Sequence, residues 1–503
     1  MKKAMIWLLL AALIAGSGCS SESQKDDAIT SGAEQPPQDT EQTQLQTEDG
    51  ITYTLPEADY NGDTFVIASR EPVNGSWSII AKNPYQQEEE TGDVIDDAIF
   101  LRERTIEEQY NINLEMFPYD FSKPLTVIKS MLAGDNLYDT IECSAWYINQ
   151  FLAYHTLLVD YLSMDVVNLD HPWWEQTAIE KLSLGGRLYT ITGDAVMIHP
   201  LSEAVIYFNK QIVDDYDLAN PYQLVRDGKW TLDEMYSMSK IVASDLDGDN
   251  EMHVDTDRLG LMASDTSLAY FVRAAGFDLT QKNQDDIPVL SMYSEHNVNV
   301  MNKVQTMLQD TDNNYNTALV KPKNAVNGEA FYALVLPSFK SGRGLFHFNW
   351  VFIAMDLRDM EIDFGMLPMP KYDENQDNYI SLTCDNWDTF TMIPYTDDER
   401  IARAGTILEA LGCYGMEYLT PATIDKTVSS KAVRDEDSIE MMSIIMDVIN
   451  YDVASIYDWG GLVSFFRTFG GKENKEFASY YAAKENSIMT DMEKTLEALA
   501  DPS

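Results

Sequence analysis

Residues 111–143 read NINLEMFPYDFSKPLTVIKSMLAGDNLYDTIEC. Alternating apolar and polar residues predict a strand over 111–117, and apolar residues at helical spacing predict a helix over 125–133 that stops at Gly134. The segment Tyr-Asp-Thr-Ile-Glu-Cys over 138–143 predicts another buried strand. A strand, a helix and a second strand in this order are typical of a mostly parallel sheet that is covered by helices.

The same pattern extends in both directions from this stretch. A β-branched apolar run at 64–68 predicts the first strand, and an amphipathic helix is predicted over 93–110. Later strands are predicted at 204–208 and 363–367, and later helices at 231–242, 397–411, 438–449 and 474–499. The fold class predicted from these elements is α/β.

Chain length predicts how many lobes the protein has, and its net charge disfavours some classes of ligand. The roughly 445 residues after position 58 exceed what one core usually organises, so two lobes are expected. The formal net charge is −47, and no basic cluster interrupts the acidic surface. Binding to nucleic acid or to anionic lipid headgroups is therefore disfavoured, and self-repulsion favours solubility.

The N-terminus is predicted to be a targeting signal and not part of the fold. Lys2 and Lys3 precede an apolar run over 4–15, which is too short to span a bilayer. Gly16-Ser17-Gly18-Cys19 resembles a bacterial lipobox, although that pattern prefers an aliphatic residue where Gly16 stands. The prediction is a signal peptide over 1–18, a lipidated Cys19 and a polar, disordered linker over 19–57. The alternative is an ordinary cleaved signal with an incidental cysteine.

A lipidated Cys19 leaves three further cysteines, Cys143, Cys384 and Cys413. The odd number and the absence of a CxxC spacing favour three buried, inert thiols. One disulfide with one free thiol stays open as the alternative.

Several short blocks resemble known proteins, and their order along the chain is more specific than any single block. They are 138–139, 146–147, 157–160, 172–175, 182–189, 207–210, 220–224, 228–234, 360–371 and 457–461. In this order they resemble the bacterial extracellular solute-binding proteins of family 1, the maltose-binding type, which serve carbohydrate ABC transporters as lipoproteins.

The resemblance implies a two-lobed periplasmic-binding-protein-like fold of type II, with a hinge that the chain crosses more than once and a central cleft. Lobe 1 would hold 58–167 and 389–420, and lobe 2 would hold 168–388 and 421–503. It also implies a monomer, anchored on the extracellular face of the cell membrane, that passes a solute to ABC transporter permease subunits.

The nine Trp and 27 Tyr favour a carbohydrate ligand, because flat rings cover the apolar faces of a sugar while charged and amide groups bind its hydroxyls. Residues that follow predicted strands are the first candidates, because ligands bind beyond the carboxyl ends of strands in such sheets. The candidate ligand-binding residues are Arg70, Glu71, Trp146, Tyr147, Asp194, Trp350, Trp387 and Trp459. For any single Trp the alternative is core packing; for Arg70 and Glu71 it is a solvated pair, and for Asp194 a turn.

A separate acidic stretch resembles a calcium loop. Its possible ligands are Asp245, Asp247, Asp249, Glu251 and Asp257. Asn250 replaces the usual Gly and Thr256 the usual closing Glu, so a one-residue shift would make Asp257 the closing ligand. A plain acidic loop is the alternative to a structural calcium site, and no other cofactor is expected.

The rival function classes are a secreted glycoside hydrolase and a carbohydrate-binding surface protein. A hydrolase needs two suitably spaced carboxylates, but 82 acidic residues make some such pair inevitable. The sequence holds no HExxH, GxSxG, GxxxxGK[ST] or GxGxxG motif in a suitable context. We therefore expect a binding protein and not an enzyme.

Overall fold

The computed structural model describes residues 44–46, 52–72, 82–197, 199–317, 319–320, 331–428, 436–470 and 476–500. The predicted signal peptide, Cys19 and most of the predicted linker lie outside these ranges. Two short strands at the start, β1 (Gln44–Gln46) and β2 (Thr52–Thr54), pair antiparallel.

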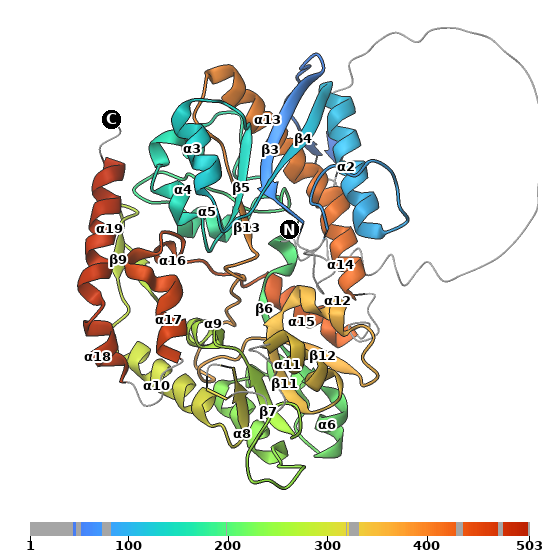
Figure 1. The fold of residues 1–503 in the computed structure, drawn as a ribbon, viewed down its shortest axis with the longest axis vertical. Coiled ribbons are helices and arrows are strands. Elements are labelled where there is room, and N and C mark those ends of the chain that lie inside the picture. The colour runs from blue at the N-terminus through green and yellow to red at the C-terminus, as the bar shows by residue number, and fades with distance from the viewer. Residues whose placement is uncertain are drawn as a thin grey trace, which may run out of the picture.

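The first lobe is built on a four-stranded sheet, which lies at the top of Figure 1. Its strands stand in the order β13 (Thr389–Met392), β5 (Thr140–Ser144), β3 (Asp63–Arg70) and β4 (Ile112–Tyr119). β3 runs parallel to β4 and β5, and only β13 runs antiparallel. All four strands fall within the ranges predicted for lobe 1.

Residues 111–143 fold as predicted, into β4, α3 (Leu125–Ala133) and β5. Helix α2 (Val94–Tyr110) precedes them and connects β3 to β4. The Asp93 carboxylate caps the start of α2 by accepting hydrogen bonds from two backbone N–H groups, and Gly134 ends α3 in the left-handed conformation.

The second lobe is built on a five-stranded sheet at the bottom of Figure 1. Its order is β10 (Asn314–Asn316), β7 (Leu259–Ala263), β11 (Gly344–Trp350), β6 (Ala204–Asn209) and β12 (Phe364–Pro368). β6 runs antiparallel to both of its neighbours, whereas β10, β7 and β11 are parallel. These strands fall within the range predicted for lobe 2.

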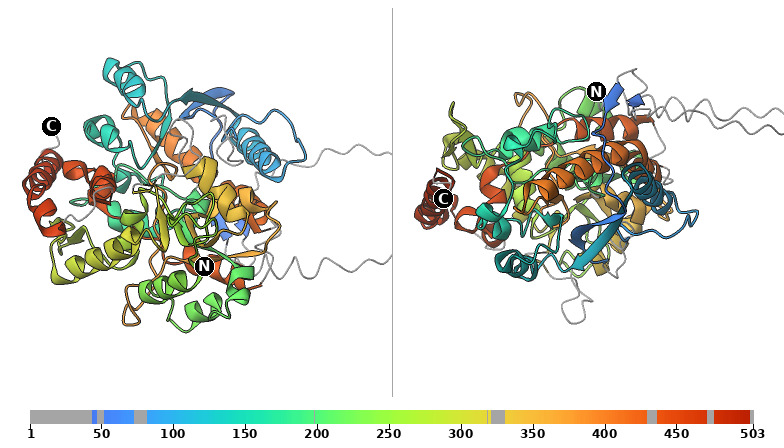
Figure 2. Two further views of the ribbon diagram at one scale, coloured as in Figure 1. Left: turned by 60° about the horizontal axis from the view of Figure 1, so that its bottom comes forward. Right: turned by 90° about the horizontal axis from the view of Figure 1, so that it is seen from above.

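Helices cover the sheets and form most of the remaining structure. They are α4 (Asn149–Leu152), α5 (Gln176–Leu182), α6 (Lys210–Asp215), α7 (Pro221–Arg226), α8 (Leu232–Val242), α9 (Ser267–Ala274), α10 (Glu295–Gln309), α11 (Phe331–Lys340), α12 (Ala354–Leu357), α13 (Asp398–Tyr414), α14 (Thr420–Val428), α15 (Glu436–Met446), α16 (Val453–Ile456), α17 (Leu462–Gly470), α18 (Phe477–Ala482) and α19 (Glu485–Ala500). Both views in Figure 2 place the C-terminal helices α17 to α19 at one end of the molecule. No helix within the described ranges is both long and apolar enough to cross a membrane.

The chain passes between the two sheets along paired extended segments. The backbone N–H of Ala204 donates to the carbonyl of Leu382 at 2.8 Å, and the backbone N–H of Cys384 donates to the carbonyl of Ser202 at 2.7 Å. One segment leads into β6 and the other leads back to β13, so these two passages lie side by side. We refer to residues 202–204 and 382–384 as the crossing. The lobe boundaries themselves stay predictions.

The three cysteines of the described structure are all buried and none forms a disulfide. This agrees with the simpler of the two interpretations drawn from the sequence. Burial raises the pKa of the Cys143 thiol to about 12, which keeps it protonated and unreactive.

Candidate functional site

Three predicted site residues meet at the carboxyl end of the four-stranded sheet. Trp146 follows β5, and its backbone N–H donates to the carbonyl of Asp385 at 2.7 Å. Arg70 is the last residue of β3, and its guanidinium carbon lies 5.9 Å from the centroid of the Trp387 ring. Arg70, Trp146 and Trp387 are therefore neighbours, although more than 300 residues separate the first from the last.

The segment 384–388, which leaves the crossing toward β13, organises this meeting point. The backbone N–H of Ala145 donates to the carbonyl of Asp388 at 3.0 Å, which ties the segment to the end of β5. Since strands β3 and β5 are parallel, their carboxyl ends present Arg70 and Trp146 to the same segment. We call residues 384–388 the junction segment.

The second lobe reaches the junction segment through Tyr270 of α9. Its hydroxyl oxygen accepts a hydrogen bond from the Asp385 backbone N–H at 3.3 Å. Trp350, the last residue of β11, packs edge-to-face on Tyr270 with ring centroids 6.4 Å apart. Trp350 is buried and is linked to the segment through Tyr270, from the opposite lobe, so its role in ligand binding stays a prediction. No sequence signal distinguishes Tyr270 from the other tyrosines.

Buried charged groups lie close to Arg70. Glu142 of β5 is buried, and its two carboxylate oxygens accept hydrogen bonds from the hydroxyls of Ser69 and Tyr85 at 2.5 Å each. Burial raises the pKa of Glu142 and lowers the pKa of Arg70 to about 10, while attraction between the two groups opposes both shifts. Burial also raises the pKa of Asp385 to about 6 against the attraction of Arg273.

A second buried charge cluster lies behind the junction segment. The His199 ring stands between Asp388 and Glu175, with nitrogen-to-oxygen distances of 3.3 and 3.5 Å. Burial alone would lower the pKa of His199, but the hydrogen bonds and charges of the two carboxylates outweigh it and raise the pKa to about 10. Tyr451 donates to the other oxygen of Asp388 at 3.4 Å, and Glu203 of the crossing is fully buried nearby. Sequence reasoning missed this cluster.

The other predicted site residues have different surroundings. Glu71 is exposed, and Tyr147 is half-buried beside Trp146. Asp194 is buried and accepts a hydrogen bond from the Thr420 hydroxyl at 2.8 Å. Trp459 is buried against the C-terminal helix, where its indole N–H donates to Thr495 at 2.9 Å. The structure therefore gives Asp194 and Trp459 packing contacts within the fold.

The acidic loop brings together three of its five predicted ligands. Carboxylate oxygens of Asp245, Asp247 and Asp257 all lie within 4.8 Å of one another. Asn250 adopts the left-handed conformation with φ 66°, as its place in the turn predicts. Asp249 and Glu251 are not part of this group of three.

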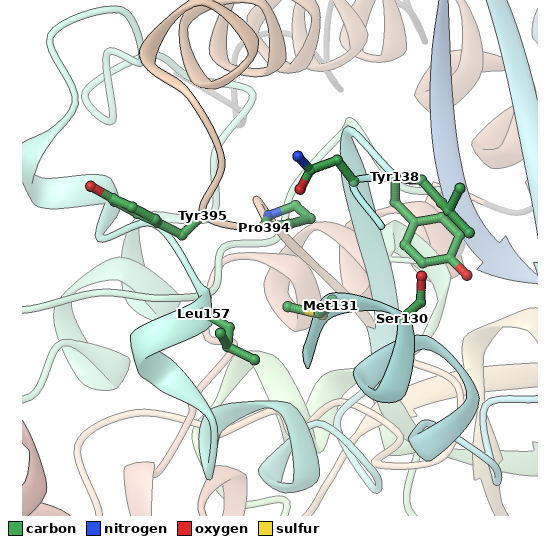
Figure 3. Close-up of a pocket in the computed structure, with 8 residues that line it drawn as sticks. Ser130, Met131, Tyr138, Leu157, Pro394 and Tyr395 are labelled. Carbon is green, nitrogen blue, oxygen red and sulfur yellow. The ribbon is translucent and has the colours of Figure 1, made fainter. Parts of the chain in front are cut away.

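A small open recess lies away from the junction segment, on the first lobe (Figure 3). Tyr138 and Leu137 precede β5, and Pro394 and Tyr395 follow the antiparallel strand β13, so the recess is at the amino end of β5. Tyr395 and Leu157 flank it on one side in Figure 3, and Tyr138 on the other. No pattern in the sequence predicts this recess.

No protein-family model matches the sequence, and no curated protein matches it either. Solved structures do match the fold over most of the chain. A cyclic α-maltosyl-1,6-maltose binding protein from Arthrobacter globiformis has 11% identity and a TM-score of 0.53, covering 86% of this chain and 99% of its own. The chain has the fold of ABC transporter substrate-binding proteins.

Two further structures extend this comparison. An ABC substrate-binding protein from Listeria monocytogenes, in complex with cycloalternan, has 12% identity and a TM-score of 0.51, covering 87% of this chain and 99% of its own. UgpB from Mycobacterium tuberculosis, in complex with glycerophosphocholine, has 12% identity and a TM-score of 0.52, covering 82% and 98%. The two-lobed α/β fold predicted from the sequence is confirmed.

Proposed function

We propose that this protein captures a mono- or oligosaccharide at the junction segment and delivers it to an ABC transporter, and that it is not an enzyme. The observation that carries the proposal is the approach of aromatic side chains from both lobes to the junction segment, beside a guanidinium and carboxyl groups. Trp146, Trp387 and Arg70 come from the first lobe's strand ends and the junction segment, and Trp350 comes from the second lobe.

This mixture of groups suits a sugar. Indole faces cover its apolar C–H surfaces, while Asp385 and the Arg70 guanidinium supply an acceptor and donors for hydroxyl groups. Two fold neighbours were solved as a cycloalternan complex and as a cyclic maltosyl-maltose binding protein, which supports the same ligand class. The glycerophosphocholine complex of UgpB defines the main competitor, a glycerol phosphodiester.

The test is a thermal-shift screen of the purified protein against neutral oligosaccharides and glycerophosphodiesters, followed by calorimetry on each positive ligand. We expect a rise in Tm that grows with ligand concentration by mass action. Trp387→Ala should weaken binding roughly 5- to 30-fold, because an aromatic platform contributes about 1–2 kcal/mol. Tyr395→Ala, at an exposed position away from the junction segment, is the matched control and should bind like the parent.

Chromatography of the ligand after incubation separates a binder from the rival glycoside hydrolase. A binding protein returns the sugar intact, whereas release of reducing ends would overturn the proposal. A shift with glycerophosphodiesters and none with sugars would overturn the ligand class but keep the binding role.

We further propose that Cys19 is lipidated and holds the protein on the outer face of the cell membrane. The apolar run over 4–15 and the small residues before Cys19 support this. Mass spectrometry of the N-terminal peptide should find a lipid on the Cys19 sulfur, and Cys19→Ser should release the protein into the medium. Membrane retention of the Cys19→Ser protein would refute the anchor.

We also propose that the acidic loop binds Ca²⁺ as a structural ion, with Asp245, Asp247 and Asp257 as ligands. The closeness of their carboxylate oxygens, within 4.8 Å, supports a hard cation with oxygen ligands. Calcium titration followed by calorimetry should give a single site that Asp247→Asn weakens. An absence of binding heat at millimolar Ca²⁺ would leave a plain acidic loop.

A further inference from the structure

A small hairpin of the second lobe reaches across to the first lobe. Strands β8 (Thr280–Lys282) and β9 (Pro288–Leu290) pair antiparallel and follow helix α9. The Asn297 side chain of α10 holds the hairpin's base, because its amide nitrogen donates to the carbonyls of Asp278, Ser291 and Met292 at 3.0–3.2 Å. Helix α10 in turn is tied to β10 of the five-stranded sheet, since Asn314 donates to its Met307 carbonyl at 2.9 Å.

The loop that the hairpin meets, residues 183–187, is fastened to the first lobe. The N–H of Leu188 donates to the Asp160 carboxylate at 2.9 Å, and the N–H of Tyr161 donates to the Leu188 carbonyl at 2.8 Å. The backbone N–H of the neighbouring Val159 donates to the carbonyl of Ile393 at 2.9 Å. Ile393 is the first residue after β13. The loop is therefore fastened to the four-stranded sheet, although residues 183–187 fall within the range predicted for lobe 2.

The contact between hairpin and loop is dense and polar. The Lys282 ammonium donates to the Glu180 carbonyl at 2.8 Å and to the Ser183 hydroxyl at 2.9 Å. The Asp286 carboxylate accepts from the Ser183 hydroxyl and from the Gly186 N–H, both at 3.1 Å. Its backbone carbonyl accepts from Gly185 at 3.1 Å.

Lys282 and Asp286 also support each other. Their ammonium and carboxylate lie 2.7 Å apart, and both side chains keep partial access to solvent. Asp286 sits in the left-handed conformation with φ 60°, which the tight turn of the hairpin requires. A contact made of such groups can open and close, because water can take the place of each partner.

We propose that the β8–β9 hairpin is a latch that holds the two lobes in the relative arrangement seen here, through a contact separate from the crossing. Two-lobed proteins of this fold change shape by rotation about their chain crossings. A second polar contact between the lobes biases that equilibrium toward the arrangement in which it is made. The latch depends on the fold and not on the identity of the ligand.

The test uses the ligand-free, full-length protein and two variants, Lys282→Met and Asp286→Asn. Asparagine tolerates the left-handed turn, so the second variant removes charge while keeping the hairpin. Lys303→Met is the matched control, because it removes a 2.7 Å ion pair with Asp233 that lies within the second lobe. Circular dichroism and thermal unfolding check that all three variants fold.

The readouts are amide exchange and a distance between the lobes. Amide exchange at Gly185 and Gly186 should quicken roughly tenfold in both latch variants and stay unchanged in the control. Spin labels at Leu132→Cys and Ile241→Cys, exposed positions on α3 and α8, should show a broader or shifted distance distribution. Cys19→Ser in the labelled protein leaves only buried native thiols.

An unchanged distance distribution alongside faster exchange would overturn the latch, because the contact would then open without affecting the lobes. Unchanged exchange and unchanged distances in both variants would also overturn it. Since no ligand is present, neither result bears on whether the protein binds a sugar.

Discussion

The buried carboxyl group of Glu203 offers the sharpest test of the electrostatics at the crossing. The side chain is fully buried, and neither carboxyl oxygen has a hydrogen-bond partner within the described structure. Burial raises its pKa from the ordinary 4.5 to about 8. Positive His199 opposes the shift, while Asp388 and Glu175 add to it.

The sign of the pH dependence follows from this shift. In the unfolded chain Glu203 ionises above pH 4.5, but in the folded protein it keeps its proton up to about pH 8. The free energy of unfolding therefore falls between these two values and is insensitive to this group outside them. Each pH unit in this window corresponds to about 1.4 kcal/mol. The difference between a pKa of 4.5 in the unfolded chain and about 8 in the folded protein therefore amounts to about 5 kcal/mol.

Glu203→Gln removes the titration while keeping the shape and polarity of the neutral acid. We expect the variant to gain stability relative to the parent by about 1.4 kcal/mol for each pH unit between 5 and 8, and no further above pH 8. Urea unfolding at five pH values from 5 to 9 measures this difference. His199 titrates in both proteins, so its contribution largely cancels in the comparison.

Glu115→Gln, at an exposed position of β4, is the matched control and should follow the parent at every pH. A constant stability difference between Glu203→Gln and the parent from pH 5 to 9 would refute the reasoning. It would mean that Glu203 is as ionised in the folded protein as in the unfolded chain.

Three further substitutions test other contacts by urea unfolding at pH 7. His199→Gln leaves Glu175 and Asp388 buried without their counter-charge and should cost about 3–5 kcal/mol; a cost below 1 kcal/mol would show that water compensates them. Asp139→Asn should cost about 3 kcal/mol, because the buried carboxylate pairs with Arg400 and Arg403 of α13 at 3.0 and 2.7 Å, and an unchanged midpoint would contradict this. Gly193→Ala would place a Cβ 2.0 Å from the Trp173 carbonyl oxygen and should cost more than about 2 kcal/mol, whereas Gly186→Ala meets no atom within 4 Å and should cost only about 1 kcal/mol of backbone strain.

The fold could be predicted to a large extent because its local signals agree with its tertiary structure. The helix predicted over 125–133 forms with those bounds, and the strand predicted over 64–68 lies inside β3. Strands such as β13 and β7 were not predicted. Each is four or five residues long and gains its stability from partners that are distant in the sequence, so it carries little periodic signal of its own.

The site could be predicted only in part, and the reason is physical. Arg70 and Trp146 follow strands, so the rule that ligands bind beyond strand ends was enough to select them. Trp459 was selected on a different signal, its place before Gly460 and Gly461, and a Trp in this setting occurs both in binding loops and in core turns. In the structure its indole is buried and donates to Thr495 of α19, and its role in ligand binding stays a prediction. Tyr270, His199 and Glu203 meet their partners from elements far apart in the sequence, and no spacing rule connects them.

The buried charged groups at the crossing suit a junction at which the two lobes can separate and close again. In a static core, burying Glu203, Asp388 and His199 together would cost several kcal/mol that apolar side chains would avoid. The cores of the two lobes also bury charged groups, among them Asp139 and Glu142 in the first lobe and Asp257 in the second, but there ion pairs or hydrogen bonds hold the carboxyl oxygens. At the crossing, by contrast, the Glu203 carboxyl is buried without a hydrogen-bond partner within the described structure, near the charges of His199 and Asp388. If the lobes separate there, water solvates these groups again, so a polar junction can open at a cost that an apolar junction of the same area would exceed. A junction of this composition is what a protein needs if it must close on a solute and later let it go.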